Sequence, residues 1–323
     1  FIIAEIGNNH EGNLDVAEEL IYQAAKSGAN AVKFQSIDPY KLVSEKEKNR
    51  IKQLQKFQIS YENHYRLKKV ADENNVIFLS TPFSVEAVNF LDSMVPAFKI
   101  ASSDNNYFEL IECIAKKQKP ILLSTGMSSM EEITFTLKKI KKIWRKLKKN
   151  NELVLLHCVS AYPTPKKFAN LAAIKTLSSL GFTVGYSDHT IGIQAAVLSV
   201  GLGARVIEKH FTLSKNYSQF RDHRLSAEPT EFKELVQRVK NANILLGNGE
   251  KKLVNVEKVT AKQSRRSICA ATDLMKGKKI TTKDLICIRP SGGLPPEQKK
   301  KIIGKKLLRS IKAGEKIKIN FLG

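Results

Sequence analysis

The chain has 323 residues, of which 42% are hydrophobic and 26% charged, and its formal net charge is +23. This composition excludes a disordered protein, and no stretch approaches the roughly 18 uninterrupted apolar residues of a membrane span. The length favours one large domain plus a small one. Four scattered cysteines without a C-x-x-C pair exclude a disulfide framework and a structural zinc site, and they indicate a reducing, cytoplasmic location.

Eight short β-type runs alternate with patterns whose apolar residues lie three and four apart. The first run is predicted to be a strand and not a signal peptide, because no basic region precedes it. Eight repeats over roughly 245 residues match an α/β fold of the (β/α)8 TIM-barrel type better than an open doubly wound sheet. The long interval 36–75 has room for an extra loop or helix. The runs are residues 2–7, 31–36, 76–81, 97–102, 120–125, 153–160, 183–188 and 205–211.

A second domain is predicted after the barrel. We assign residues 1–247 to the barrel, 248–263 to a polar linker and 264–323 to a small β-rich domain. From about residue 264 the β-type runs are short and separated by turn residues. DLMKGKKI (273–280) and SIKAGEKI (310–317) form a weak repeat. Two copies are too few for a solenoid.

The positive charge is mostly lysine spread along the chain. Its densest run, 137–151, keeps Leu137, Ile140, Trp144 and Leu147 at helical spacing, which predicts the solvated face of a surface helix. A nucleic-acid or membrane-surface patch is the alternative, but no aromatic residues interleave with the lysines as a stacking platform. We therefore expect neither nucleic acid nor membrane as a partner. A positive field also suits an enzyme with anionic substrates.

Polar residues occupy the C-terminal end of every predicted strand, and in a barrel these ends surround one mouth. Because residues two apart share a face of a strand, Glu208 and His210 are expected to point inward and Lys209 outward, toward a partner among the helices. The residues expected at the mouth are Glu5, Lys33, Gln35, Thr81, Lys99, Ser102, Ser124, Thr125, His157, Ser160, Ser187, Asp188, His189, Glu208 and His210.

Two kinds of binding chemistry are expected there. His189 and His210 end consecutive strands, so they could hold an exchangeable divalent cation acting as a Lewis acid. Lys33 and Lys99 would need anions, and the hydroxyls of Thr81, Ser102, Ser124 and Ser187 add donors suited to a phosphate and a carboxylate together. Nucleotide-binding glycine motifs are absent.

The remaining ionisable residues are less telling. Glu5 could be an acid/base or the counter-ion of a lysine, and Glu208 a ligand, an orienting group or an acid/base. His10 and His223 are expected to form hydrogen bonds within loops, and His64 lies in a helical stretch away from the chemistry.

Several motifs in this order resemble the sialic acid synthase family: EIGNNHEG, VKFQ, FLSTPF, FKIASS, LSTGM, LHCVSAYPTP, GYSDHT and IEKHFT. The tail, from SICAATDLMKGKKI to SIKAGEKI, is similar to the antifreeze-like (SAF) domain that ends those enzymes. The resemblance covers nearly the whole chain. It implies condensation of phosphoenolpyruvate with N-acetylmannosamine or a related acylamino hexose, with release of phosphate by C–O cleavage.

The resemblance also implies roles for individual residues. His189 and His210 would hold Mn²⁺, or Mg²⁺ or Co²⁺ in its place. Glu5, Glu208 and Asp222 are the acid/base candidates. The residues implied around phosphoenolpyruvate are Lys33, Thr81, Lys99, Ser102, Ser160 and Ser187, and those implied around the sugar are Gln35, Tyr162, Asp222 and Arg289. Arg289 would act from the SAF domain of the other subunit in a domain-swapped homodimer.

The chain departs from the family pattern next to Asp222. Phe220 and Arg221 stand where related synthases commonly have Gly-Pro, and Ser160 stands where Asn or Thr is frequent. These differences leave the acceptor open among N-acetylmannosamine, its 6-phosphate and a diacetamido hexose. The alternatives to a synthase are a metal-dependent aldolase or lyase acting on a keto acid sugar, and a polyanion-binding protein on an inactive barrel.

Overall fold

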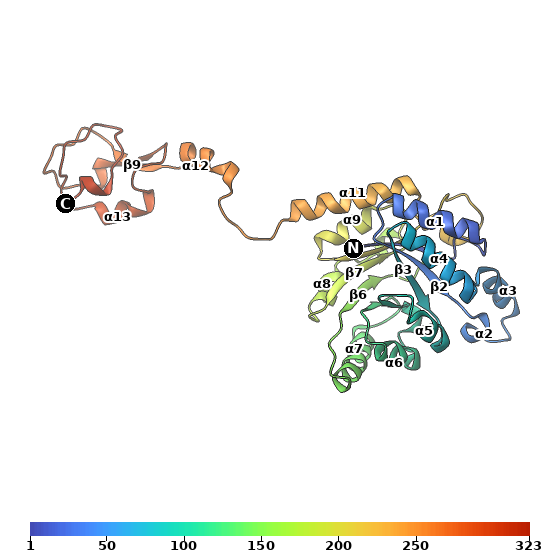
Figure 1. Ribbon diagram of the computed structural model, residues 1–323. Coiled ribbons are helices and arrows are strands. Elements are labelled where there is room, and N and C mark those ends of the chain that lie inside the picture. Colours follow the sequence, from blue (N-terminus) through green and yellow to red (C-terminus); the bar gives the residue numbers. More distant parts are fainter. The chain divides into compact units, whose positions relative to one another are not determined.

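The computed structural model describes residues 1–323 as two compact units, Phe1–Gly247 and Asn248–Gly323 (Figure 1). The first unit is a ring of helices around a central sheet. The second is small and has a core of its own.

The eight strands of the first unit are all parallel, in the order β3-β2-β1-β8-β7-β6-β5-β4. The two end strands, β3 and β4, lie against each other, so the sheet is a nearly closed barrel and the predicted fold is confirmed. The strands are β1 Ile2–Gly7, β2 Ala31–Ser36, β3 Ile77–Pro82, β4 Phe98–Ile100, β5 Ile121–Ser124, β6 Leu153–Cys158, β7 Thr183–Asp188 and β8 Val206–His210.

Helices surround the barrel, and the long ones among them carry an apolar stripe that they bury. In α7 the buried residues include Ile133, Ile140 and Trp144, and the lysines lie between them. The lysines of the basic run therefore lie on the solvent-exposed face of a helix. Leu147, at the C-terminal end of this helix, is 39% exposed and does not continue the apolar stripe. The helices are α1 Leu14–Lys26, α2 Pro39–Leu42, α3 Lys48–Phe57, α4 Tyr61–Glu73, α5 Val85–Leu91, α6 Phe108–Lys116, α7 Met130–Lys146, α8 Ala173–Ser178, α9 Gln194–Gly201, α10 Arg221–Leu225 and α11 Pro229–Leu246.

The second unit is built on an antiparallel pair, β9 Ser267–Ala270 and β10 Leu285–Ile288, with α12 Lys258–Ser264 and α13 Lys299–Ile302. Isolated bridges, such as Leu274 to Ile311, join the rest of its short extended segments. Its buried core includes Ile268, Leu285 and Ile317. None of the helices in the structure combines the length and apolarity that a membrane crossing needs.

Candidate active site

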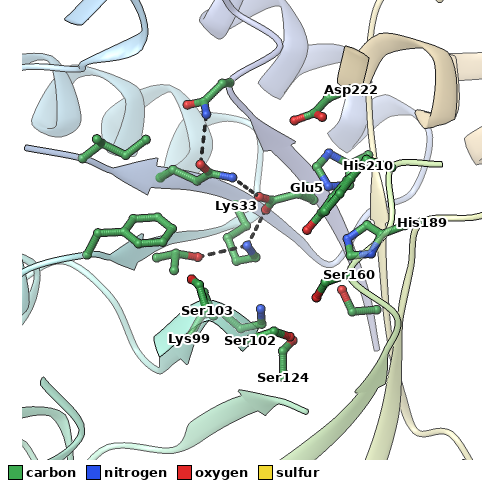
Figure 2. Close-up of a pocket in the computed structure, with 18 of the residues that line it drawn as sticks. Glu5, Lys33, Lys99, Ser102, Ser103, Ser124, Ser160, His189, His210 and Asp222 are labelled. Atoms are coloured by element: carbon green, nitrogen blue, oxygen red, sulfur yellow. Dashed lines mark hydrogen bonds and ion pairs between the residues drawn. The ribbon is translucent and has the colours of Figure 1, made fainter. Parts of the chain in front are cut away.

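The C-terminal ends of the barrel strands enclose a cavity of about 490 Å³ (Figure 2). Every residue of the first unit that was singled out for catalysis or binding lies in its lining. These residues are Glu5, Lys33, Gln35, Thr81, Lys99, Ser102, Ser124, Ser160, Tyr162, Ser187, His189, Glu208, His210 and Asp222. Arg289 belongs to the second unit, just after β10, and its role stays a prediction.

A buried ion-pair network forms the floor of the cavity. Lys33 Nζ lies 2.5 Å from Glu5 Oε2 and 3.6 Å from Glu208 Oε2, and it donates a hydrogen bond to Thr81 Oγ1 at 3.0 Å. Lys99 Nζ lies 3.4 Å from the other oxygen of Glu208. Glu208 thus bridges the two ammonium groups that were expected to bind anions.

The two carboxylates of this network have different proton affinities. Burial raises the pKa of Glu5, and the ammonium group of Lys33 offsets only part of that rise. Burial also pushes up the pKa of Glu208, but Lys33 and Lys99 outweigh it and bring that pKa to about 2. Ser187 Oγ supports the ionised form by donating to Glu208 Oε1 at 2.8 Å. Glu208 is therefore a fixed negative charge, and Glu5 is the carboxyl closer to exchanging a proton.

Serine hydroxyls form the wall beside Lys99. Ser124 Oγ and Ser160 Oγ are buried and have no protein hydrogen-bond partner, so they are free to bond a ligand. The backbone N–H of Gly126 donates to Ser102 Oγ at 3.0 Å. A Cβ at position 126 would lie 2.5 Å from Ser160 Oγ and 2.8 Å from Ser102 Oγ, so this close approach requires glycine.

The imidazoles of His189 and His210 face each other on the opposite wall, with ring centroids 5.4 Å apart. His189 Nδ1 lies 2.9 Å from the Val159 carbonyl oxygen, to which it donates, so its Nε2 keeps a free lone pair. Burial, with help from His189 and Lys33, lowers the pKa of His210 well below its ordinary value, and His210 Nδ1 has no partner. Burial opposes protonation of His189, but Cys158 and the Val159 carbonyl outweigh it and raise the pKa of His189, so only His210 is held neutral by its surroundings. Two facing imidazoles, each with a nitrogen that has no protein partner, have the donor type that a divalent cation binds. The structure contains no cluster of three or more potential metal-binding side chains.

Phe220 and Arg221, the two residues that differ from the family pattern, lie at the rim of the cavity beside the histidines. Tyr162 lies against His189 with ring centroids 4.3 Å apart, and the Arg221 guanidinium carbon lies 4.8 Å from the Tyr162 ring centroid. Arg221 Nε also lies 3.3 Å from Asp222 Oδ1. Phe220 packs on Phe57 of α3 at 4.8 Å between centroids. The two unusual residues thus both lie in the cavity lining, with the Arg221 side chain 61% exposed.

Three residues expected at the mouth face away from it. His157 Nε2 bonds to the Ala169 carbonyl at 2.8 Å, and Thr125 Oγ1 donates to the Leu156 carbonyl at 3.0 Å. Asp188 pairs with Lys209 outside the barrel at 3.0 Å. Each is out of phase by one residue with the inward face, because adjacent side chains on a strand point to opposite sides.

Two of the other histidines lie as expected, and His223 does not. Gly12 N donates to His10 Nδ1 at 3.0 Å in the loop after β1. His223 was expected on a loop but lies in the short helix α10, where it bonds to Thr212 and Glu11. His64 is buried in α4 and bonds to Ser36.

Several lining residues were not anticipated from the sequence. Asn8 Nδ2 donates to Gln35 Oε1 at 3.0 Å, and Gln35 Nε2 donates to Glu5 Oε1 at 3.1 Å, so the amides form a chain to the floor. An apolar wall comes from the insertion between β2 and β3. The only signal for it was the length of the 36–75 interval. The wall residues are Leu42, Val43, Leu54 and Phe57.

Comparisons with known proteins agree with this geometry. Residues 20–251 match the NeuB family, and residues 265–322 match the SAF domain. An uncharacterised protein of Methanocaldococcus jannaschii is 43% identical, over 95% of this chain and 90% of its own length. The N,N'-diacetyllegionaminic acid synthase of Legionella pneumophila is 39% identical, over 97% of this chain and 92% of its own. A crystal structure of the N-acetylneuraminic acid synthetase of Leptospira borgpetersenii superposes with a TM-score of 0.76 at 36% identity, over 80% of this chain and 89% of that one.

Proposed function

Since the chain belongs to the NeuB family, we propose that it is a nonulosonic (sialic acid-type) synthase that condenses phosphoenolpyruvate with an acylamino hexose. The observation that carries this proposal is the division of the cavity. Two buried ammonium groups and free serine hydroxyls lie on one side, and a pair of facing imidazoles lies on the other.

Phosphoenolpyruvate would occupy the lysine and serine side. It carries a carboxylate and a phosphate on one small skeleton, and Lys33 and Lys99 supply the charges for both. Ser124 and Ser160 offer hydroxyls that have no other partner. Charge-assisted hydrogen bonds of this kind are about twice as strong as neutral ones, so they fix the orientation of the enol.

The acceptor would occupy the other side, between the imidazoles and the rim. A divalent cation held by His189 and His210, Mn²⁺ or a similar ion, supplies Lewis-acid polarisation of a carbonyl oxygen when bound. Tyr162, Asp222 and Gln35 would bind the hydroxyl and amide groups of the sugar. The apolar wall of the β2–β3 insertion suits the methyl of its acyl group.

The proposed reaction forms one C–C bond and replaces the bond from C2 to the phosphate oxygen by a bond from C2 to the oxygen of a water. C3 of the enolpyruvate attacks the aldehyde carbon of the open-chain sugar, and positive charge develops at C2. The ionised Glu208 stabilises that charge, because its carboxylate is held between the two lysines without a proton. Water adds at C2, and Glu5 is a candidate for passing one of its protons to the oxygen of the former aldehyde. The bond from C2 to the phosphate oxygen then breaks, a keto group forms at C2, and inorganic phosphate leaves with the second proton of the water.

The test is phosphate release from phosphoenolpyruvate in the presence of Mn²⁺ and a panel of acylated hexosamines, with the 2-keto acid product measured in parallel. Release that requires both substrates is expected. Silence across the panel, with metal bound, contradicts the proposal. A lyase would instead release pyruvate from a keto acid sugar without phosphate. The variant His210→Ala is expected to abolish turnover while the unfolding temperature is retained.

A further inference from the structure

Asp188 and Lys209 form an ion pair that is completely buried and lies outside the cavity. Both side chains are 0% exposed, and Lys209 Nζ lies 3.0 Å from Asp188 Oδ2. The two residues are partners in the register of β7 and β8. Each immediately precedes one of the facing imidazoles, of His189 and His210. The pair is thus one residue from both halves of the candidate cation site.

The pair also holds the residue on the far side of His189. Lys209 Nζ donates to the Thr190 carbonyl oxygen at 2.5 Å. Asp188 Oδ1 accepts from the Thr190 backbone N–H at 2.8 Å and from the Tyr186 hydroxyl at 3.2 Å. His189 therefore lies between Asp188 and Thr190, and both of these residues bond to Lys209. Thr190 also bonds to the Asp188 carboxylate.

The pair stands where the backbone ladder stops. Asp188 with Lys209 is the last register pair between β7 and β8. Beyond it Phe211 bonds to Glu5 and bridges to Ala227, while the His189 carbonyl accepts from Thr164 N. The imidazoles of His189 and His210 thus belong to the residues that directly follow the last register pair of β7 and β8. The side-chain link therefore lies at the end of the ladder, next to both imidazoles.

A buried ion pair is a poor device for stability, because the desolvation of two charges offsets most of their attraction. Two apolar side chains of the same volume would fill this site as well. What the charged pair adds is direction, since its hydrogen bonds fix the Thr190 backbone as well as the partner side chain. This directional link acts on the separation of the two strand ends.

We infer that Asp188 and Lys209 are positioning residues that clamp the ends of β7 and β8, so that the imidazoles of His189 and His210 bind one divalent cation together. The inference rests on the proposed metal-dependent function. The clamp does not touch the cavity, so it acts through the spacing of the two ligands. Groups that orient metal ligands typically contribute a factor of 10 to 100 in metal affinity.

The experiment measures Mn²⁺ binding to the full chain by calorimetry, without substrates, together with the unfolding temperature of each variant. The variant Asp188→Asn leaves the buried ammonium group of Lys209 without its counter-ion, and Lys209→Met leaves the buried carboxylate of Asp188 without its own. Both single variants are expected to lose stability and Mn²⁺ affinity. The double variant removes both charges. It is expected to recover most of the unfolding temperature while Mn²⁺ binding stays at least about tenfold weaker.

A double variant that folds and binds Mn²⁺ as tightly as the wild type overturns the inference, because the pair would then be structural only. Tyr186→Phe is a milder change that removes one hydrogen bond to Asp188 and leaves both charges. We expect it to weaken binding by about threefold to tenfold. If the double variant does not fold, unchanged affinity in Tyr186→Phe overturns the inference.

Two controls separate this inference from the proposed function. Asp92 and Lys117 form a half-buried pair at 3.1 Å on the helical layer, and their double variant Asp92→Asn/Lys117→Met is expected to bind Mn²⁺ normally. His210→Ala is expected to lose binding. If His210→Ala binds like the wild type, the metal assignment of the proposed function is wrong and the clamp falls with it.

Discussion

The substitution Arg221→Ala tests how the rim recognises the acceptor. The guanidinium carbon lies 4.8 Å from the Tyr162 ring centroid, and Nε lies 3.3 Å from Asp222 Oδ1. A cation–π contact at an exposed site contributes about 0.5–1 kcal/mol, and an exposed ion pair about 0.2–1 kcal/mol. Together these contacts contribute about 0.7–2 kcal/mol to the orientation of two proposed sugar-binding side chains, which corresponds to roughly 3- to 30-fold in acceptor affinity.

The assay follows phosphate release while the acceptor concentration is varied at saturating phosphoenolpyruvate. We expect the KM for the acceptor to rise by roughly that factor and the KM for phosphoenolpyruvate to stay unchanged, because different side chains bind it. Arg238→Ala is the matched control, since Arg238 is also 61% exposed in its side chain and pairs with Glu234 on α11. An unchanged acceptor KM, or a change confined to phosphoenolpyruvate, would refute this account of the rim.

Three further predictions concern other parts of the chain. Lys33→Met should reduce the free energy of unfolding by about 3–5 kcal/mol in urea titrations, because it leaves Glu5 buried without its cation. Adding Glu5→Gln should restore most of that stability but no activity. An active double variant would contradict the proposed role of Lys33 in binding phosphoenolpyruvate. Burial raises the pKa of Asp104 to about 6, so wild-type stability should fall as pH rises from about 4 to 6. Asp104→Asn should therefore be equally stable at about pH 4 and more stable by about 1–3 kcal/mol above pH 7, because the ionised carboxylate of Asp104 is buried in the wild type; an equal difference at both pH values would count against it. Arg289→Ala should raise the acceptor KM without affecting Mn²⁺ binding if Arg289 acts from a partner subunit, and an unmoved KM excludes that role.

Much of the barrel could be predicted because its signal is local. The eight apolar runs lie within a few residues of the observed strands. The alternation of side chains then placed Lys33 with Gln35, and Glu208 with His210, on one face. The strand from residue 97 is shorter than predicted, ending at Ile100, because Ser102 opens a 3-10 turn.

The parts that could not be predicted depend on contacts between distant segments. The outward direction of His157 follows from the phase of β6, since its neighbour Cys158 points into the cavity, and the residue types alone do not reveal that phase. The buried partner of Lys209 was foreseen as a position but not as Asp188, which had been expected inside. The contact of Phe57 with Phe220 joins segments far apart in the chain, and no local pattern encodes it.

The apolar wall has a consequence for how this enzyme could be re-engineered. The side chains proposed to bind the anion, such as Lys33, Lys99 and Ser124, project from the strands themselves. The residues of the wall lie in α2 and α3 and at their ends, within the insertion between β2 and β3. We therefore expect that replacing residues 37–58 by the corresponding segment of another synthase transfers part of that synthase's acceptor preference. Position 220 would need to be changed with the segment, because Phe220 packs on Phe57. The segment can thus change and alter the acceptor, while the lysine and serine side proposed for phosphoenolpyruvate keeps its residues.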